Sequence, residues 1–293
     1  MRITSLAVLV SGLVSCFAPS AIAWGRSGHY MIGEATYQLL DENTRELLNE
    51  AVQLQTSFNS SMGTASIWAD IVKYTPKYAW TRVLHYYDNE ASDPPTRCEF
   101  HAPEATDKKN MLSAIQNFTD TFIKDKRLNT LMNIHLLQDL HQPLHLAGKA
   151  RGGNSVDIPL PYPSHRNVSL HGYWDVNAVN MLVNRYHGNT SHIIEDLVSN
   201  PVANVVIELN EAGMTGNYVT RIDTKVTKLS LSDQCDSSSL MKWAKESERR
   251  NCEFVWRETY DQDYHMAAPD HVYTLLKLAS WRSACHLTKM LNQ

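Results

Sequence analysis

The chain has 293 residues, with 27 basic residues, 31 acidic residues and a formal net charge of −4. This length suffices for one large domain or two small ones. The acidic balance argues against binding of nucleic acid through a broad lysine-rich surface, which needs cations against the phosphates. It does not exclude a site centred on metal ions, because bound ions are often the largest local charges.

Residues 1–23 have the pattern of a secretory signal peptide. Arg2 provides a basic start, an apolar stretch follows up to Phe17, and Ala21-Ile22-Ala23 is a small-x-small cleavage site. No later stretch approaches the ~18 apolar residues of a membrane span. We therefore predict a signal peptide at 1–23, a mature domain at 24–293, and export to the periplasm or the exterior without stable membrane insertion. A lipoprotein box ending at Cys16 is the alternative, and it would leave Trp24 internal.

The cysteines that follow the signal are even in number, which favours two disulfides with three possible pairings. They are Cys98, Cys235, Cys252 and Cys285. No C-x-x-C pair occurs among them, so a cysteine zinc site is not expected. Four asparagines open N-x-Ser/Thr sequons and are possible glycosylation sites: Asn59, Asn117, Asn167 and Asn189.

Helical periodicity dominates the mature chain. Apolar residues recur at helical spacing in three stripes, near 32–40, 111–122 and 131–140. Further helical stretches are predicted at 44–54, 63–73, 173–187, 193–212, 238–260 and 268–291. Strand-like alternation is scarce, and a small β-hairpin is expected near 156–170. Segments 88–105 and 147–166 read as loops, so the sequence predicts one all-α, mainly helical domain with no repeats.

Two His-x3-Asp pairs carry the chemical signal. His135 and Asp139 lie four residues apart and share one helix face, and His171 and Asp175 repeat the spacing. Pro143 ends the first helix, so the chain can turn and bring His145 back to the same place.

Asp70 and His85 offer further ligands upstream. One such pair alone is more often a surface polar pair, but two pairs behind a signal peptide predict a multi-metal site. Nitrogen and carboxylate donors without thiolate suit zinc.

These motifs occur in an order that resembles a known family. In order they are Trp24-Gly-Arg-Ser-Gly-His29, Trp68-Ala-Asp70, Leu84-His85, His135-x3-Asp139-x-His-Gln-Pro-Leu-His145, Gly152-Gly-Asn154 and Leu170-His171-x2-Trp174-Asp175. The chain is similar to the zinc-dependent single-strand-specific nucleases and 3′-nucleotidases (type I nucleases), part of the phospholipase C/nuclease superfamily. The resemblance covers essentially the whole mature chain.

The resemblance implies three zinc ions in a surface cleft of a monomeric protein with no obligate protein partner. One ion would be held by Asp70, His85, His135 and Asp139. A second would be held by the α-amine and carbonyl of Trp24, by His29 and by the other oxygen of Asp139. The third would be held by His145, His171 and Asp175. Because the amine of Trp24 ligates only after signal cleavage, metal loading would be coupled to export.

The implied activity is hydrolysis of single-stranded DNA or RNA to 5′-phosphate products, and removal of 3′-phosphate from 3′-nucleotides. A hydroxide that bridges two zinc ions would attack phosphorus, with Asp70 orienting it. Lys73 stands where the family commonly has an arginine, so it keeps a catalytic positive charge but loses the bidentate fork. This departure bears on rate and pH optimum.

The resemblance also implies residues that bind substrate. Tyr86 would stack on a base, which requires a single strand, and Asp88 would accept hydrogen bonds from the base edge. Arg151 replaces a smaller apolar residue and would pack on the base or contact phosphate. Asn154 would either bind near the zinc ions or fix its loop.

Two other functions compete with the nuclease. A zinc-dependent phospholipase C is similar in fold and ligand order, but its last ligand is usually glutamate where this chain has Asp175. The Trp-Ala-Asp and Gly-Gly-Asn segments also favour the nuclease. A non-catalytic zinc-binding secreted protein is the second alternative, although no expected ligand is missing.

Overall fold

The computed structural model describes residues 24–164, 166–199, 235 and 238–293. The predicted signal peptide at 1–23, the alternative lipidation site at Cys16 and the part of the predicted helix 193–212 beyond residue 199 lie outside the described residues.

The described chain is mostly helical, as predicted. Its α-helices are α1 (Gly25–Leu39), α2 (Glu42–Val52), α3 (Leu54–Phe58), α4 (Met62–Ser66), α5 (Trp68–Val72), α6 (Met111–Asp120), α7 (Lys126–Asp139), α8 (Leu170–Gly172), α9 (Ala178–Arg185), α10 (Thr190–Ser199), α11 (Ser239–Arg250) and α12 (Gln262–Leu291). Short 3-10 helices are η1 (Ala79–Leu84), η2 (Phe122–Lys124) and η3 (Pro143–Leu146), and π-helical turns are η4 (Tyr173–Asn177) and η6 (Asn251–Val255).

The predicted hairpin is confirmed. Strands β1 (Asp157–Pro159) and β2 (Asn167–Ser169) pair antiparallel, with Ile158 opposite Val168. They form the one sheet of the described residues, so the all-α prediction with a small hairpin holds.

Several predicted helices have other bounds. The stretch 63–73 is divided at Ile67 into α4 and α5, and 173–187 begins as the π-helical turn η4. The stretch 238–260 is α11 followed by η6. The helix predicted at 268–291 begins earlier, because the Asp261 side chain accepts a hydrogen bond from Tyr264 N and caps α12 ahead of Pro269.

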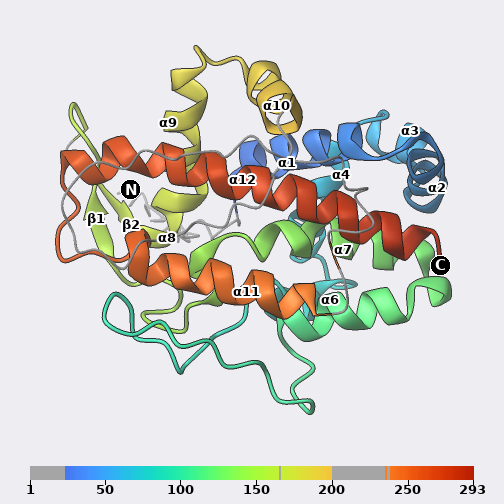
Figure 1. Ribbon diagram of the computed structural model, residues 1–293, viewed down its shortest axis with the longest axis horizontal. Helices are drawn as coiled ribbons and strands as arrows, with labels where there is room; N and C mark the ends of the chain where they lie inside the picture. The colour runs from blue at the N-terminus through green and yellow to red at the C-terminus, as the bar shows by residue number, and fades with distance from the viewer. Residues whose placement is uncertain (1–23, 165, 200–234, 236–237) are drawn as a thin grey trace, which may run out of the picture.

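Helix α7 forms the centre of the fold. Every residue from Asn129 to Asp139 is buried, so α7 is covered on all sides, as expected of a core helix. It packs against α2, α4, α5, α6 and α12. Figure 1 shows α12 running along the length of the molecule, with α9 and α10 on one side of it and α11 on the other. Polar side chains carried by α7 are thereby held in a rigid interior.

Two disulfides join distant parts of the chain. Cys98 pairs with Cys252 and Cys235 pairs with Cys285, which settles the pairing that the sequence left open. The first ties the loop after Tyr87 to η6, and the second attaches residue 235 to α12.

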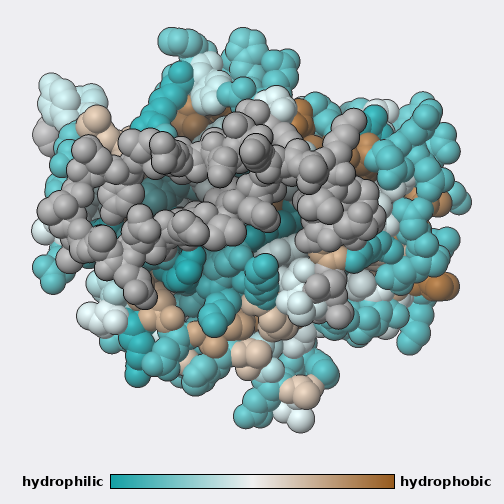
Figure 2. Space-filling model, viewed as in Figure 1, coloured by the Kyte–Doolittle hydropathy of each residue, from teal (hydrophilic) through white to brown (hydrophobic). Residues whose placement is uncertain are grey.

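On the face shown in Figure 2, most of the described surface is polar, with apolar residues in small scattered places. Among the described helices, none combines the length and the apolar character that crossing a membrane requires.

Candidate metal centre

Five His and Asp side chains meet beside the middle of α7. His29 comes from α1, Asp70 from α5, and His135 and Asp139 from α7, while His85 directly follows η1. All five are at least 97% buried. We call this group the five-residue cluster. Elements from residues 29 to 139 therefore converge on one point, which the His135-x3-Asp139 spacing alone did not require.

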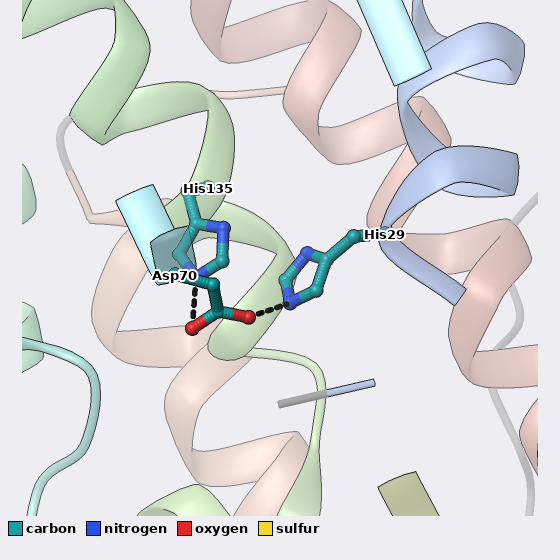
Figure 3. A group of neighbouring side chains, drawn as sticks. All are labelled: His29, Asp70 and His135. Carbon is teal, nitrogen blue, oxygen red and sulfur yellow. Dashed lines mark ion pairs between the residues drawn. The ribbon is translucent and has the colours of Figure 1, made fainter. Parts of the chain in front are cut away.

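The ligand atoms of this cluster face one another. Asp139 Oδ1 lies 3.3 Å from His29 Nε2, while Asp139 Oδ2 lies 3.0 Å from His85 Nδ1 and 3.3 Å from His135 Nε2. The Asp139 carboxylate thus faces histidines on two sides of the cluster. Asp70 does the same, with its oxygens 3.5 Å from His135 Nε2 and 3.8 Å from His29 Nε2 (Figure 3).

Buried hydrogen bonds fix the histidines of the cluster. His29 Nδ1 donates to Gln138 Oε1 at 2.7 Å, and His135 Nδ1 donates to the Ser66 carbonyl at 2.7 Å. Gln138 in turn donates to Ser66 Oγ at 3.0 Å. With the proton of each neutral ring on Nδ1, Nε2 is the nitrogen whose lone pair can face a cation in the cluster, as in metal-binding histidines.

The second group comprises His145 of η3, His171 of α8 and Asp175 of η4, all at least 95% buried. We call it the three-residue cluster. His171 Nε2 lies 3.2 Å from Asp175 Oδ2. The other oxygen, Asp175 Oδ1, accepts a hydrogen bond of 2.7 Å from Gln142 Nε2. Asp175 therefore has one oxygen fixed by the protein and one directed to the cluster.

The histidines of this cluster are held by backbone carbonyls. His145 Nδ1 donates to the carbonyl of His85 at 2.6 Å, and His171 Nδ1 donates to that of Gly152 at 2.7 Å. Gly152 has φ +61, and a Cβ there would lie 2.6 Å from the Leu144 carbonyl. Only glycine fits this close approach without strain. This explains why the first position of the Gly152-Gly153 pair is glycine.

Both clusters can hold metal ions. Groups of His and Asp ligand atoms within 4.8 Å of one another are His29–Asp70–His135, His85–His135–Asp139 and His145–His171–Asp175. Several of their buried atoms have no hydrogen-bond partner: His29 Nε2, Asp70 Oδ2, Asp139 Oδ1, His171 Nε2 and Asp175 Oδ2. Buried polar atoms without partners are costly. Divalent cations bound between them would satisfy these atoms.

The charges in the five-residue cluster are strongly coupled. Burial opposes the charged form of His135, but Asp139 and Asp70 outweigh it and raise the pKa of this imidazole to about 10. Burial is the largest influence on Asp139 and favours its neutral acid, but His135, His29 and His85 together hold its pKa well below the usual range. In the metal-free protein, therefore, a proton on His135 compensates the carboxylates, and a cation has to displace it.

Lys73 is buried beside Asp70. Its Nζ donates to Asp70 Oδ1 at 2.6 Å. Burial disfavours the ammonium, but the Asp70 carboxylate more than offsets this and raises the pKa of Lys73. The structure thus keeps a positive charge at the edge of the five-residue cluster, at the position named from the sequence.

The residues predicted to bind substrate lie at the surface. Tyr86 is 39% exposed, and Asp88 and Arg151 are also exposed. Burial and the charge of Asp88 raise the pKa of the Tyr86 phenol, and Arg151 lowers it, so the three lie in one neighbourhood. The Asn154 side chain donates to the Arg151 carbonyl at 2.8 Å and thereby fixes the loop.

Trp24 is fully buried at the start of α1. Its indole Nε1 donates to the carbonyl of Gln138, 2.9 Å away, so the ring is anchored to α7 beside His29. Ligation by the amine and carbonyl of Trp24 stays a prediction, as does the surface cleft. The four sequon asparagines (Asn59, Asn117, Asn167 and Asn189) are exposed.

Comparison with known proteins identifies the family. A family model described as S1/P1 nuclease matches residues 24–292. The chain belongs to the S1/P1 nuclease family. It is 23% identical to Nuclease S1 of Aspergillus oryzae over 84% of this chain and 81% of the relative. It is 26% identical to Endonuclease 1 of Arabidopsis thaliana over 67% of this chain and 68% of the relative.

A further relative is Nuclease P1 of Penicillium citrinum, which is 26% identical over 55% of this chain and 60% of the relative. The resemblance seen in the motifs is thereby confirmed, and the protein is a nuclease, an enzyme that acts on phosphodiester bonds. As an S1/P1 nuclease it has three buried His/Asp groups that can hold the metal ions of such an enzyme.

The sequence interpretation missed the residues that orient the ligands. Gln138 holds His29, Gln142 holds Asp175, and the Ser66 carbonyl holds His135. Gln138 lies three residues after His135 and so near the same helix face, and Gln142 lies in the turn before His145. A polar residue at such spacing inside a buried helix is the signal that identifies them.

Proposed function

We propose that this S1/P1 nuclease is an exported, zinc-dependent enzyme that cleaves single-stranded DNA and RNA to 5′-phosphate products and also removes the phosphate of 3′-nucleotides. The observation that carries the proposal is the pair of adjoining His/Asp clusters, whose buried ligand atoms lack partners. The names of the fungal and plant relatives, nucleases and an endonuclease, support a nucleic-acid substrate.

The donor set favours zinc and a count of three ions. The clusters offer only imidazole nitrogen and carboxylate oxygen, which are donor types that suit this ion. The five-residue cluster would hold two ions with Asp139 shared between them, because its two oxygens face different histidines. The three-residue cluster would hold the third. Zinc, when bound, supplies activated water near neutral pH and positive charge for the phosphoryl oxygens.

The chain's own residues then position the phosphodiester. Asp70 is aligned by Lys73, and the Lys73 ammonium adds charge where the phosphoryl oxygens become more negative. Tyr86, half-exposed directly after His85, offers its ring to a base. A base that stacks on this ring has to leave its own helix stack, and this is the physical reason for preferring a single strand.

Metal removal and readdition test this proposal. The secreted protein is expected to contain about three zinc ions per chain, to lose hydrolysis of single-stranded DNA and RNA on chelation, and to regain it with zinc. Duplex of the same sequence is expected to be cleaved far more slowly. As a matched pair, His145→Ala is expected to lose one ion and most activity, while the exposed His192→Ala keeps both.

Three results would overturn the proposal. Cleavage of phosphatidylcholine without cleavage of nucleic acid would make the protein a phospholipase C. About three zinc ions with no hydrolysis of any phosphoester would make it a binding protein. N-terminal sequencing is the third test, because a mature chain that does not begin at Trp24 cannot use a Trp24 amine as a ligand.

A further inference from the structure

The segment between two cluster residues, Asp70 and His85, differs in composition from the rest of the chain. Residues 71–87 contain three basic residues and no acidic one, although the whole protein has a net charge of −4. The same segment carries five aromatic residues: Tyr74, Tyr78, Trp80, Tyr86 and Tyr87. Cations interleaved with aromatic rings are what a single strand requires, since the cations contact phosphates and the rings stack on bases.

The fold turns part of this segment into an exposed ridge. Residues three apart eclipse one another on a 3-10 helix, and in η1 Thr81 and Leu84 form the buried side. Trp80 is 52% and Val83 37% exposed on another side. The 3-10 helix ends at Leu84, His85 still has helical backbone angles, and Tyr86, three residues after Val83, is exposed as well. We call Trp80, Val83 and Tyr86 the Trp80 ridge.

The Trp80 ring lies near another aromatic ring on one side but is not buried in the protein core. Its ring lies 6.4 Å from that of Phe118 in α6, at an interplanar angle of 52°. About half of the Trp80 side chain is therefore exposed to water, in a segment that contains no acidic residue. Exposed aromatic surface of this kind indicates a binding role.

The neighbouring cations are held in place by rings and backbone. Arg82 Nε donates to the Lys73 carbonyl at 2.8 Å, and its guanidinium lies 5.3 Å from the Tyr74 ring. Lys77 Nζ lies 4.9 Å from the Tyr78 ring. Within the described part of the chain, neither Lys77 nor Arg82 forms an ion pair with a carboxylate. Their charges remain available to phosphates.

We propose that the Trp80 ridge is an extended binding surface for single-stranded nucleic acid, in which Trp80 stacks on a base beyond the one held by Tyr86. The inference rests on the proposed function. At about 2.0 Å of rise per residue, the ridge from Trp80 to Tyr86 is about 12 Å long. A stacked strand advances about 3.4 Å per nucleotide, so the ridge has room for more than one base. Paired bases in a duplex cannot open onto it.

Substrate length separates this surface from the metal centre. We would compare phosphate release from a 3′-mononucleotide with release from a 3′-phosphorylated trinucleotide, resolving internal cleavage by chromatography. In the wild-type protein the trinucleotide is expected to have the lower KM. Trp80→Ala is expected to raise that KM about tenfold, as for loss of one base stack, with less than a twofold change for the mononucleotide. Trp80→Phe, which keeps an aromatic face, is expected to restore most of the difference.

Matched variants control for the loss of any exposed aromatic side chain and for the loss of any exposed positive charge. Tyr162→Ala removes an aromatic side chain that is 85% exposed in the hairpin loop, and it is expected to change neither KM. Lys77→Ala is expected to raise the trinucleotide KM about threefold and to weaken its salt dependence, whereas Lys108→Ala, also at an exposed position, has no effect.

The outcomes distinguish the two proposals. If the wild type releases phosphate from both substrates but Trp80→Ala alters the two KM values equally, the ridge plays only a structural role and the inference is wrong, while the proposed function stands. Equal KM values for both substrates in the wild type would also overturn it. If the zinc-loaded wild type hydrolyses neither substrate, the proposed function fails first.

Discussion

The two clusters of the metal centre are built in different ways. The five-residue cluster draws its ligands mainly from regular helices, with His29 on α1, Asp70 on α5, and His135 and Asp139 on α7. The three-residue cluster lies on short irregular elements, with His145 on a 3-10 helix and Asp175 in a π-helical turn. Such π-turns occur frequently at functional sites. The first cluster is therefore part of the core, and the second depends on loops.

Charge separates the clusters further. The five-residue cluster contains two carboxylates and lies beside Lys73, whereas the three-residue cluster contains only Asp175, one oxygen of which accepts a hydrogen bond from Gln142. The five-residue cluster thus offers two anionic ligands and the three-residue cluster offers one, which accords with the proposal of two ions in the first and one in the second. Under the proposed function, the pair of ions would therefore be held mainly by core helices, and the third ion by short irregular elements.

The clusters are nevertheless connected. His145 Nδ1 donates to the carbonyl of His85, whose imidazole belongs to the other cluster. Asp139 is also close enough to influence the pKa of both His145 and His171. A substitution in one cluster can thus affect the other. Substituting one residue of each cluster in turn tests how far the two clusters depend on each other.

The largest effect is expected from Asp139→Asn. This change removes the carboxylate that faces both sides of the five-residue cluster, so zinc content should fall from about three to about one per chain. Hydrolysis of single-stranded DNA should fall by more than about 10³-fold, because metal ions supply several kcal/mol of transition-state stabilisation. Elemental analysis and kcat/KM measure the two quantities.

Asp175→Asn provides the contrast. It should remove one ion, leave about two, and reduce activity by about 10²-fold, since the pair of ions persists. The exposed Asp263→Asn serves as the control and should change neither quantity. Equal losses of zinc in Asp139→Asn and Asp175→Asn would contradict a division into a two-ion and a one-ion cluster.

The sequence predicted which His and Asp side chains lie together, but it predicted less of what surrounds them. His135 and Asp139 are four residues apart on one helix, so a local spacing contains the geometry. The motif order supplied Asp70 and His85, which the chain brings near α7 only through tertiary packing. The all-α fold and the hairpin also followed from local periodicity, although the start of α12 and the division at Ile67 did not.

The remainder depends on contacts between distant segments. The pairing of Cys98 with Cys252 spans 154 residues, and nothing local in the sequence selects it. The π-helical turn that carries Asp175 is a backbone adjustment that a helical spacing rule treats as an ordinary helix. Gln138 and Gln142 orient ligands across the core, and their partners are visible only once the helices are packed.

An intermediate effect is expected from removing these two glutamines. Gln138→Leu takes away the acceptor of His29 Nδ1, and Gln142→Leu takes away the donor to Asp175 Oδ1. Loss of such orienting partners typically costs 10- to 100-fold in metal affinity. Competition with a chelator should show weaker binding of the two-ion cluster in Gln138→Leu and of the single ion in Gln142→Leu.

The control for the glutamine pair is Gln116→Leu, at an exposed position of α6, which should bind zinc like the wild type. If both core variants weakened the same ions, the clusters would not be supported independently. That result would indicate that the two clusters form one cooperative unit, linked through His85 and His145, and are not two separate sites.

The smallest effect concerns Glu248, which is linked through Asn251 to the element that carries His145. Asn251 Nδ2 donates both to Glu248 Oε2 at 3.0 Å and to the carbonyl of Pro143 at 2.8 Å, and Pro143 begins the 3-10 helix that carries His145. Burial raises the pKa of Glu248 from its ordinary 4.5 to about 7, although Ser92, Asn251 and Asn89 lower it through hydrogen bonds.

Because the folded pKa lies above the unfolded one, the stabilisation by the neutral acid is complete below pH 4.5 and is lost as pH rises through about 7. Glu248→Gln mimics the neutral acid at every pH. Relative to the wild type, its free energy of unfolding should therefore rise by about 3 kcal/mol between pH 4.5 and pH 8. Urea unfolding with intact disulfides measures this, and the exposed Glu258→Gln should show no such rise. A constant difference between Glu248→Gln and the wild type across this pH range would mean that Glu248 is charged in the fold, and that the support it gives to the three-residue cluster does not depend on its protonation.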